Sequence, residues 1–281
     1  MIFQFENKVA LVTDAGSGLG LASAKAFAQA GASVALADLD EKAVKTAVEE
    51  LKLAGYKAIS IRCNVAIEAD VVAMVEQTIA AFGHLDMAYN NAGIQVTVAE
   101  TADLSGDEFD RAIAVNLKGV FNCMKYELQQ MRKQEGGGAI VNCSSTGGII
   151  GTAGMAAYTA AKHGVIGLTK CAALEYAAKG IRVNAICPGV TVTPMVAKAV
   201  ADVPAHMAAI MNNIPARRFA SSEEIAATVL WLCSEDAGFM IGQAVISDGG
   251  YTVQYNRKMT HMTKGERTTQ AFIKPGLDIK S

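Results

Sequence analysis

Short apolar runs alternate with longer segments whose apolar positions recur every three or four residues, from the start of the chain to about residue 250. The short runs are typical of strands buried on both faces, and the longer ones of helices that pack one face on a sheet. Strands are predicted at residues 9–13, 33–37, 58–62, 85–89, 139–143, 182–186 and 244–247. Helices are predicted at residues 18–30, 41–54, 67–82, 107–132, 157–178 and 222–234. This alternation predicts an α/β fold, a doubly wound parallel sheet with helices on both faces.

Glycines mark the ends of three predicted helices. Gly31, Gly55 and Gly180 each follow a helical pattern, where glycine readily adopts the left-handed conformation that closes a last turn. Two segments break the rhythm: residues 190–217 are predicted to be partly helical, and residues 253–281 have a basic excess and no clear period. We therefore expect one domain at residues 1–252, followed by a C-terminal extension.

Composition excludes some classes of partner. A chain of 281 residues can bury a large core in one domain, and its 51% hydrophobic residues suggest extensive contact between subunits. The net charge of −2 gives no support to binding of nucleic acid or of an anionic membrane surface. The four histidines share no metal-ligand spacing, so we expect no metal site.

The cysteines and the N-terminus bear on the compartment. Six cysteines are scattered along the chain without a C-x-x-C pair, and most lie in apolar segments, as expected of buried thiols under reducing conditions. The N-terminus enters a strand without the basic and apolar regions of a signal peptide. No segment is long and apolar enough to predict a membrane span. We expect a cytoplasmic protein.

Three glycines, Gly16, Gly18 and Gly20, lie between the first predicted strand and the first predicted helix. Glycine there lets the backbone approach a pyrophosphate, which binds the free N–H groups at the start of the helix. A flexible turn would also explain three close glycines. The position directly after the first strand favours nucleotide binding.

Asp38 ends the second predicted strand, eighteen residues after Gly20. An acidic residue there can accept a hydrogen bond from the ribose 2′-hydroxyl and repel a 2′-phosphate, which favours NAD over NADP. A helix N-cap is the other explanation, since Asp40 and Glu41 open the next helix. Because Asp38 precedes that cap position, we prefer the cofactor role.

Tyr158 and Lys162 are four residues apart, and Ser145 lies thirteen positions before the tyrosine. Residues at i and i+4 share one face of a helix, so the phenol and the ammonium can act on the same small volume. An ammonium beside a phenol lowers the phenol's pKa from its ordinary value of about 10, as a proton donor near neutral pH requires. The spacing alone would also fit a solvated helix face.

In their order, these motifs resemble those of a classical short-chain dehydrogenase/reductase. That family pairs a Thr-Gly-x-x-x-Gly-x-Gly loop with a Tyr-x-x-x-Lys pair on a Rossmann-type sheet of seven strands, and the resemblance covers roughly residues 7–252. Further matches are Asn-Asn-Ala-Gly at 90–93, Asn-Val at 64–65 where the family usually has Asp-Val, Pro-Gly at 188–189 continuing to Thr-Pro-Met at 193–195, and Asp-Gly-Gly at 248–250.

The resemblance implies a hydride-transfer site with four catalytic residues. Tyr158 would be the general acid/base, and Lys162 would lower its pKa and bind the nicotinamide ribose. Ser145 would orient the substrate oxygen, and Asn116 would hold a water in the proton relay. NAD is the implied cofactor. The positions implied to bind it are Asp14, Gly16, Ser17, Gly18, Leu19, Gly20, Asp38, Asn64, Val65, Asn91, Ala92, Gly93, Tyr158, Lys162, Pro188, Gly189, Val190 and Thr193.

Asp14 departs from the family pattern, because it replaces the first glycine of the loop. A carboxylate at the mouth of a pyrophosphate site would repel phosphate unless it points away or forms a local Asx-turn. It could also contact the adenosine ribose and reinforce a preference for NAD.

The substrate would be lined by residues 94–97, residues 146–154 and the segment after Pro-Gly, with Gln95, Thr146 and Met195 as its predicted contacts. These segments are mostly small or apolar, and Met207 and Met211 add to them. We expect a bulky apolar or alicyclic secondary alcohol or ketone, with a hydroxysteroid first. A 3-oxoacyl reductase and a polyol or sugar-alcohol dehydrogenase are the alternatives. A protein that binds NAD without turnover has Asp14 as its only support.

Family members are commonly tetramers, so the resemblance implies a homotetramer, with a homodimer as the alternative. The tail is longer than the family's usual ending, and a disordered basic appendage is its simplest interpretation. Tyr251, Tyr255, Phe272 and Ile273 give it apolar anchors. It could therefore cross to a neighbouring subunit and cover that subunit's active site.

Overall fold

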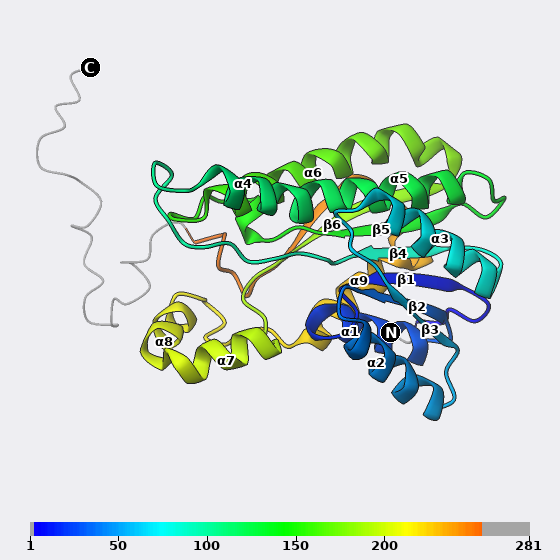
Figure 1. The fold of residues 1–281 in the computed structure, drawn as a ribbon, viewed down its shortest axis with the longest axis horizontal. Coiled ribbons are helices and arrows are strands. Elements are labelled where there is room, and N and C mark those ends of the chain that lie inside the picture. Colours follow the sequence, from blue (N-terminus) through cyan, green and yellow to red (C-terminus); the bar gives the residue numbers. More distant parts are fainter. Residues whose placement is uncertain (1–2, 255–281) are drawn as a thin grey trace, which may run out of the picture.

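The computed structural model describes residues 3–254, and it contains one seven-stranded sheet (Figure 1). The strands are β1 (Val9–Thr13), β2 (Ser33–Asp38), β3 (Ala58–Arg62), β4 (Met87–Asn90), β5 (Gly138–Cys143), β6 (Ile181–Pro188) and β7 (Ala244–Ser247). They lie in the order β3-β2-β1-β4-β5-β6-β7, and every neighbouring pair is parallel. The predicted doubly wound parallel sheet is confirmed.

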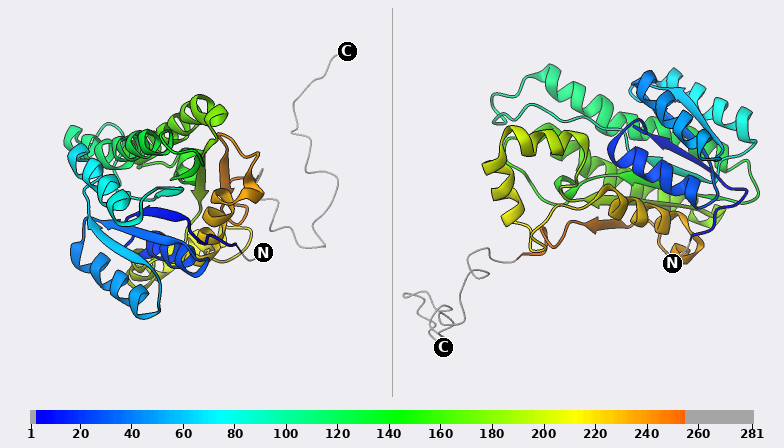
Figure 2. Two further views of the ribbon diagram at one scale, coloured as in Figure 1. Left: turned by 90° about the vertical axis from the view of Figure 1, so that its right-hand side faces the viewer. Right: turned by 90° about the horizontal axis from the view of Figure 1, so that it is seen from below.

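The helices form a layer on each face of the sheet, as the end-on view in Figure 2 shows. They are α1 (Gly18–Gln29), α2 (Glu41–Leu53), α3 (Glu68–Phe82), α4 (Gly106–Ile113), α5 (Val120–Met131), α6 (Ala156–Tyr176), α7 (Pro194–Asp202), α8 (Pro204–Asn212) and α9 (Ser222–Cys233). One hydrophobic core joins α1, α2 and α9 to the sheet, and a second joins α3, α5 and α6 to its other face. The helices α7 and α8 form a separate pair at one end of the molecule.

Local chemistry accounts for where several elements begin and end. Asp40 caps α2 by accepting a hydrogen bond from the Ala43 N–H, and Ser221 and Glu224 form a capping box at the start of α9. Gly31, Gly55 and Gly180 all have positive φ, so the three predicted helix-ending glycines are confirmed.

The structure corrects several boundaries. The predicted helix at 107–132 is α4, a π-helical turn (Ala114–Gly119) and α5 in succession, and the fourth strand begins two residues later than predicted. Residues 190–217 are partly helical, as predicted.

Among the cysteines, Cys171 is exposed, whereas the other five are buried. Of the proposed tail anchors, Tyr251 packs beside the Met207 cluster, and the other three lie outside the described residues. No helix in the described range is long and apolar enough to span a membrane.

A buried carboxyl group, that of Glu127, lies between α5 and the sheet. Glu127 on α5 is fully buried; Asn90 Nδ2 donates to its Oε2 at 2.9 Å, and within residues 3–254 its Oε1 has no partner. The same Asn90 amide donates to Asn142 on β5 at 3.0 Å. Burial raises the pKa of Glu127 to about 7, although the bond from Asn90 opposes this. The folded protein therefore keeps a proton on Glu127 to near neutral pH.

Glu127→Gln is expected to stabilise the protein at pH 8 and to have a much smaller effect at pH 5. Between the ordinary glutamate pKa and about 7, the unfolded chain releases this proton while the folded chain keeps it, so the free energy of unfolding falls as pH rises. At pH 8 this loss is on the order of 3 kcal/mol, and glutamine, which does not ionise, avoids it. Urea unfolding of both proteins from pH 5 to 8 measures the difference. A pH-independent difference would show that Glu127 does not titrate in this way.

Candidate active site

The loop from β1 to α1 has a backbone conformation that lets a ligand approach it closely. Asp14 and Gly18 both have φ near +53°, and a Cβ on Gly20 would lie 2.0 Å from the Asp14 carbonyl oxygen. Ser17, the N-cap of α1, makes no side-chain capping bond, so the N–H groups of the first turn are not taken up by it. Thr13 Oγ1 ties the loop to the segment after β4, because it accepts hydrogen bonds from the N–H groups of Asn91 and Ala92, each at 3.0 Å. This is the arrangement that a pyrophosphate needs.

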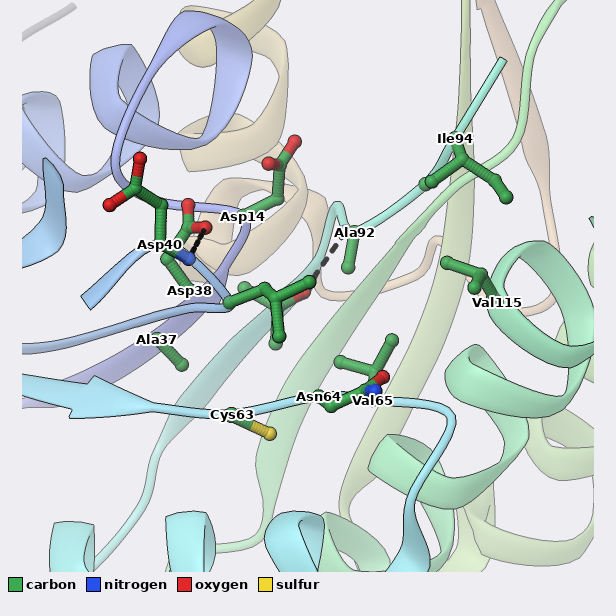
Figure 3. Close-up of a pocket in the computed structure, with 13 residues that line it drawn as sticks. Asp14, Ala37, Asp38, Asp40, Cys63, Asn64, Val65, Ala92, Ile94 and Val115 are labelled. Atoms are coloured by element: carbon green, nitrogen blue, oxygen red, sulfur yellow. Dashed lines mark hydrogen bonds between the residues drawn. The ribbon is translucent and has the colours of Figure 1, made fainter. Parts of the chain in front are cut away.

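A pocket of about 400 Å³ adjoins this loop at the carboxyl edge of the sheet (Figure 3). It lies where the strand order reverses between β1 and β4, the usual ligand crevice of such sheets. Six residues predicted to bind the cofactor line it: Asp14, Asp38, Asn64, Val65, Ala92 and Gly93. Seven further lining residues were not predicted: Thr13, Ala37, Leu39, Asp40, Cys63, Ile94 and Val115. Most of these lie next to a predicted residue in the sequence, and that adjacency could have indicated them.

Asp38 is held in this pocket by backbone donors. Its Oδ2 accepts from the Gly16 N–H at 2.8 Å, and its Oδ1 accepts from the Asp40 N–H at 2.9 Å. The cap of α2 is Asp40, so Asp38 does not act as the N-cap. Its carboxylate is fixed between the glycine loop and the start of α2.

Asp14 does not form the local Asx-turn considered above. Such a turn would need the Gly16 N–H, which donates to Asp38 instead. Asp14 Oδ2 accepts from Asn91 Nδ2 at 3.1 Å, and the side chain lines the pocket. Burial, and then the charge of Asp38, raise the pKa of Asp14 to about 7, while the charge of Lys162 acts in the opposite direction.

Ser145, Tyr158 and Lys162 meet at the carboxyl end of β5. Lys162 is 3% exposed, and its Nζ donates to the Cys143 carbonyl at 2.8 Å and lies 5.7 Å from the centre of the Tyr158 ring. A Cβ on Gly147 would lie 3.2 Å from Tyr158 Cε1 and 3.6 Å from Ser145 Oγ, so the phenol and the hydroxyl face the same small volume. Ser145 Oγ accepts from the Gly147 N–H at 3.0 Å, which leaves its own proton to donate.

The preceding serine has a structural role. Ser144 is buried and donates to the carbonyl of Lys162 at 2.9 Å, which ties β5 to α6. Two adjacent serines therefore serve different purposes, and only Ser145 faces the site.

Asn116 lies in the π-helical turn and is fully buried. Its Oδ1 accepts from the Ile94 N–H at 2.7 Å, and its Nδ2 donates to the Ile94 carbonyl at 2.9 Å. A Cβ on Gly93 would lie 3.2 Å from this Oδ1 and 3.5 Å from Lys162 Nζ, so Asn116 is beside the lysine. Because the backbone of Ile94 occupies the side-chain amide, Asn116 positions the segment that follows Asn-Asn-Ala-Gly. Its water-holding role stays a prediction.

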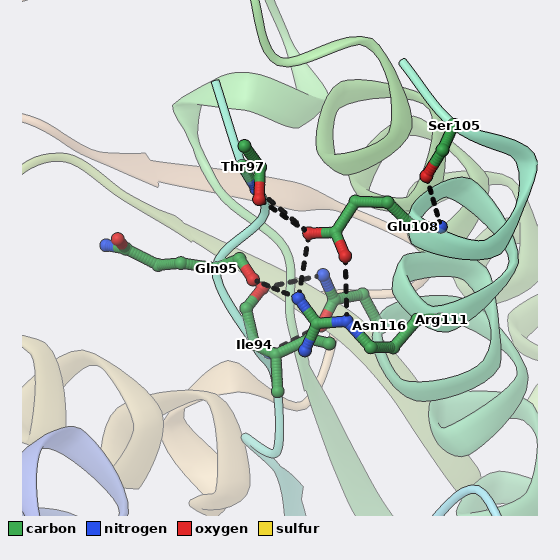
Figure 4. A network of polar contacts seen from close by, with 7 residues as sticks. All are labelled: Ile94, Gln95, Thr97, Ser105, Glu108, Arg111 and Asn116. Carbon is green, nitrogen blue, oxygen red and sulfur yellow. Dashed lines mark hydrogen bonds and ion pairs between the residues drawn. The ribbon is translucent and has the colours of Figure 1, made fainter. Parts of the chain in front are cut away.

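The next residues of that segment are fastened to α4 by an ion pair (Figure 4). Glu108 Oε1 accepts from the Thr97 N–H at 2.9 Å, and Arg111 contacts the same oxygen at 2.8 Å. Arg111 also reaches the Gln95 carbonyl at 3.5 Å. The side chain of Gln95 is exposed and not used in this network. Val96 is buried with Ala112 and Ala157, and the Thr97 hydroxyl also donates to Glu108, so Ile94 and Gln95 are the side chains of this segment that a substrate can reach.

The Pro-Gly segment after β6 reaches over the glycine loop. Thr193 caps α7, and its Cγ2 lies 3.4 Å from the position of a Cβ on Gly18. Pro188 ends β6, and Gly189 packs closely against Asp248. Val190 is half-buried and packs against the α7–α8 cluster, and its contact with the cofactor stays a prediction.

The methionines of the substrate segment differ in their surroundings. Met207 is buried in a core with Ile214 and Phe219, and Met211 packs against that core, so we assign Met207 to internal packing. Met195 lies in the first turn of α7, but its side chain is outside the described set. Thr146 is half-buried immediately after Ser145. No group of three His, Cys, Asp or Glu residues within 3–254 has the geometry to hold a metal ion.

Comparison with known proteins decides the family. A family model described as Enoyl-(Acyl carrier protein) reductase matches residues 15–252. A cyclohexanol dehydrogenase from Acinetobacter sp. (strain SE19) is 44% identical over 249 residues, which are 89% of this chain and 96% of that protein. The chain therefore belongs to the short-chain dehydrogenase/reductase family. As such it is an oxidoreductase acting on secondary alcohols or the corresponding ketones.

Two further members of the family differ in their substrates. A 2,5-dichloro-2,5-cyclohexadiene-1,4-diol dehydrogenase from Sphingobium indicum is 41% identical, covering 87% of this chain and 97% of that one. The crystal structure of a putative 2-deoxy-D-gluconate 3-dehydrogenase from Agrobacterium tumefaciens, with bound NADP, matches with a TM-score of 0.81 and 35% identity over 90% of this chain and 99% of that one. The family uses NAD or NADP.

Proposed function

We propose that this protein is an NAD-dependent dehydrogenase that interconverts an alicyclic secondary alcohol and its ketone. The observation that carries the proposal is the meeting of Ser145, Tyr158 and Lys162 beside the pocket at the carboxyl edge of the sheet, which contains Asp38. The glycine loop, the open N-terminus of α1 and the pocket fit the cofactor. When bound, the nicotinamide accepts or donates the hydride.

The side chains supply geometry and the proton. Ser145 Oγ, with its proton free, donates to the substrate oxygen and sets its distance from Tyr158. The Tyr158 hydroxyl exchanges a proton with that oxygen, as a general base for the alcohol and a general acid for the ketone. Lys162, held at the Cys143 carbonyl, lies with its Nζ 5.7 Å from the centre of the Tyr158 ring. The same ammonium is available to the ribose hydroxyls of the nicotinamide half.

Two observations support a ring alcohol as the substrate. The relatives named above include a cyclohexanol dehydrogenase and a cyclohexadiene-diol dehydrogenase. In this chain, Ile94, Ile149 and Ile150 give the segments around Ser145 an apolar character, and all three are half-buried. A hydroxysteroid is a larger member of the same class and stays a prediction. A sugar alcohol is the second candidate, favoured by the gluconate-type structural relative.

The decisive experiment is a panel of secondary alcohols and ketones with NAD and NADP, followed by absorbance of the reduced cofactor. It should contain cyclohexanol and cyclohexanone, hydroxysteroids, sugar alcohols and a 3-oxoacyl thioester. We expect the highest kcat/KM for an alicyclic alcohol, monocyclic or steroidal, with NAD. A higher kcat/KM for a sugar alcohol or a 3-oxoacyl thioester would overturn the substrate class, and a higher value with NADP would overturn the cofactor.

We also propose a cytoplasmic homotetramer. Apolar side chains are exposed along the helical layer of α4, α5 and α6, namely Phe109, Phe121 and Leu174, and near β7, namely Phe239 and Val253. Two separate exposed apolar regions suit a tetramer with two kinds of interface. The buried free cysteines are consistent with a reducing compartment.

Light scattering coupled to size-exclusion chromatography is expected to give a mass of about 118 kDa, four times the chain mass of 29.4 kDa. A tetramer should persist on dilution through the micromolar range, because apolar interfaces are generally stable. A mass near 59 kDa would indicate the homodimer, and one near 29 kDa would contradict both assemblies.

A further inference from the structure

Two carboxylates, Asp14 and Asp38, line the pocket at the carboxyl edge of the sheet, and they receive different numbers of hydrogen bonds. Asp38 accepts two backbone N–H groups, at 2.8 and 2.9 Å. Asp14 accepts a single bond within residues 3–254, from the side chain of Asn91 at 3.1 Å. Hydrogen bonds to a carboxylate favour its charged form, and a second negative charge nearby disfavours it. If one proton is shared between these two groups, Asp14 is therefore the one that carries it.

Asp14 also lies where the negatively charged pyrophosphate is expected to bind. Asp14 is the first residue after β1, and its carbonyl oxygen packs against Gly20 in the first turn of α1. A pyrophosphate bound at the N-terminus of α1 lies at this same loop. Binding of the dinucleotide thus brings two phosphate charges to a site that already contains Asp14 and Asp38.

The remaining groups around Asp14 do not neutralise these charges. Asp40, at the start of α2, lines the same pocket and is a further acid. Burial raises the pKa of Cys63 to about 12 and that of Tyr89 well above its ordinary value, so both stay neutral. Lys162 on α6 is the cation that acts on Asp14, and it is held at the Cys143 carbonyl in the catalytic set.

We propose that Asp14 takes up a proton from solvent when the dinucleotide binds, so that cofactor binding is coupled to proton uptake at the glycine loop. The neutral carboxyl group removes the repulsion and gains an O–H that donates to a phosphate or ribose oxygen, while Asn91 keeps its bond to the other oxygen. Asp38 keeps its two backbone donors. The inference rests on the proposed NAD cofactor, and it makes Asp14 a residue that adjusts cofactor affinity to pH.

The raised pKa of Asp14, about 7, places this coupling in the neutral range. Below that pH the free protein already carries the proton, so binding takes up almost none. Above it each binding event takes up close to one proton, and the Kd for NAD rises roughly tenfold per pH unit.

Isothermal titration calorimetry of NAD binding to the full chain tests this directly. Titrations at pH 6.0, 7.0, 8.0 and 8.5, each in two buffers of different ionisation enthalpy at fixed ionic strength, give both the Kd and the number of protons exchanged. For the unmodified protein we expect about 30-fold weaker binding at pH 8.5 than at pH 6, with proton uptake approaching one. Asp14→Asn is expected to abolish both effects. Asp14→Gly, which restores the family residue, should do the same and bind NAD more tightly than the parent at pH 8.

Asp40→Asn is the matched control, because it makes the same acid-to-amide change in the same pocket and asparagine also caps helices. It should keep the pH slope and the proton uptake. A flat Kd without proton uptake in the parent protein, or an unchanged slope in Asp14→Asn, would overturn the coupling while NAD binding itself stands. If NAD fails to bind the parent at every pH, the cofactor assignment and the coupling both fail.

Discussion

Replacing Tyr158 with phenylalanine is expected to lower kcat by about 10²–10⁴-fold and to leave the Kd for NAD almost unchanged, because general acid–base catalysis typically contributes that factor. The substitution removes one hydroxyl from a ring that lies 3.2 Å from the position of a Cβ on Gly147 and 5.7 Å from Lys162 Nζ. The ring itself, and therefore the packing of α6, is kept. Initial rates with the best alcohol of the panel, together with calorimetry of NAD binding, measure the two effects separately.

Tyr176→Phe is the control for this experiment. Tyr176 is on the same helix and also has a lysine over its ring, since Lys179 Nζ lies 4.4 Å from its centre. It lies eighteen residues after Tyr158, at the other end of α6, so its hydroxyl is away from the substrate, and full activity is expected. Near-normal turnover by Tyr158→Phe would contradict the assigned proton donor. NAD binding by both proteins, without oxidation of any alcohol by the parent, would instead favour a non-enzymatic NAD-binding protein.

The parts of this fold that the sequence predicts well are those set by local pattern. The strands were located because each is a short apolar run between turns, and parallel strands of this kind are buried on both faces. The residues that meet at the site were also predictable, because Ser145, Asp38 and the glycine loop each follow a strand, and parallel strands end at one edge.

The parts that could not be predicted depend on contacts between distant segments. The π-helical turn at Asn116 is coupled to the two bonds that its amide makes with Ile94, 22 residues away. Nothing in the local pattern distinguishes Met207, which is buried, from an exposed methionine that could meet a substrate. The direction of Asp14 was open for the same reason, because the donor that an Asx-turn would use is taken by Asp38, from another strand.

Asp14 and Asp38 show how one pocket can give two carboxylates different roles. Asp38 has two backbone N–H donors, whereas Asp14 has one amide partner and a pKa raised to about 7. A charged group that is held rigidly can discriminate between ligands by repulsion. A group that titrates near neutrality can instead adjust affinity to conditions.

Asp38→Ser is expected to lower the preference for NAD over NADP, measured as the ratio of kcat/KM values, by about 100-fold. A fixed carboxylate at the adenosine ribose repels a 2′-phosphate, and like charges brought together in this way cost several kcal/mol, of which each 1.4 kcal/mol is a factor of ten. Most of the change should be a gain with NADP. The KM for NAD should rise as well, because Asp38 also accepts the N–H groups of Gly16 and Asp40 that shape the loop.

Asp40→Ser separates this effect from a general loss of negative charge. Asp40 lines the same pocket and caps α2 through the Ala43 N–H, a bond that serine can also accept. This variant should keep the preference for NAD within about twofold. An unchanged cofactor ratio in Asp38→Ser, or an equal change in both variants, would mean that discrimination does not depend on the carboxylate at the end of β2. The pocket would then accept a 2′-phosphate as readily as the structural relative that contains NADP.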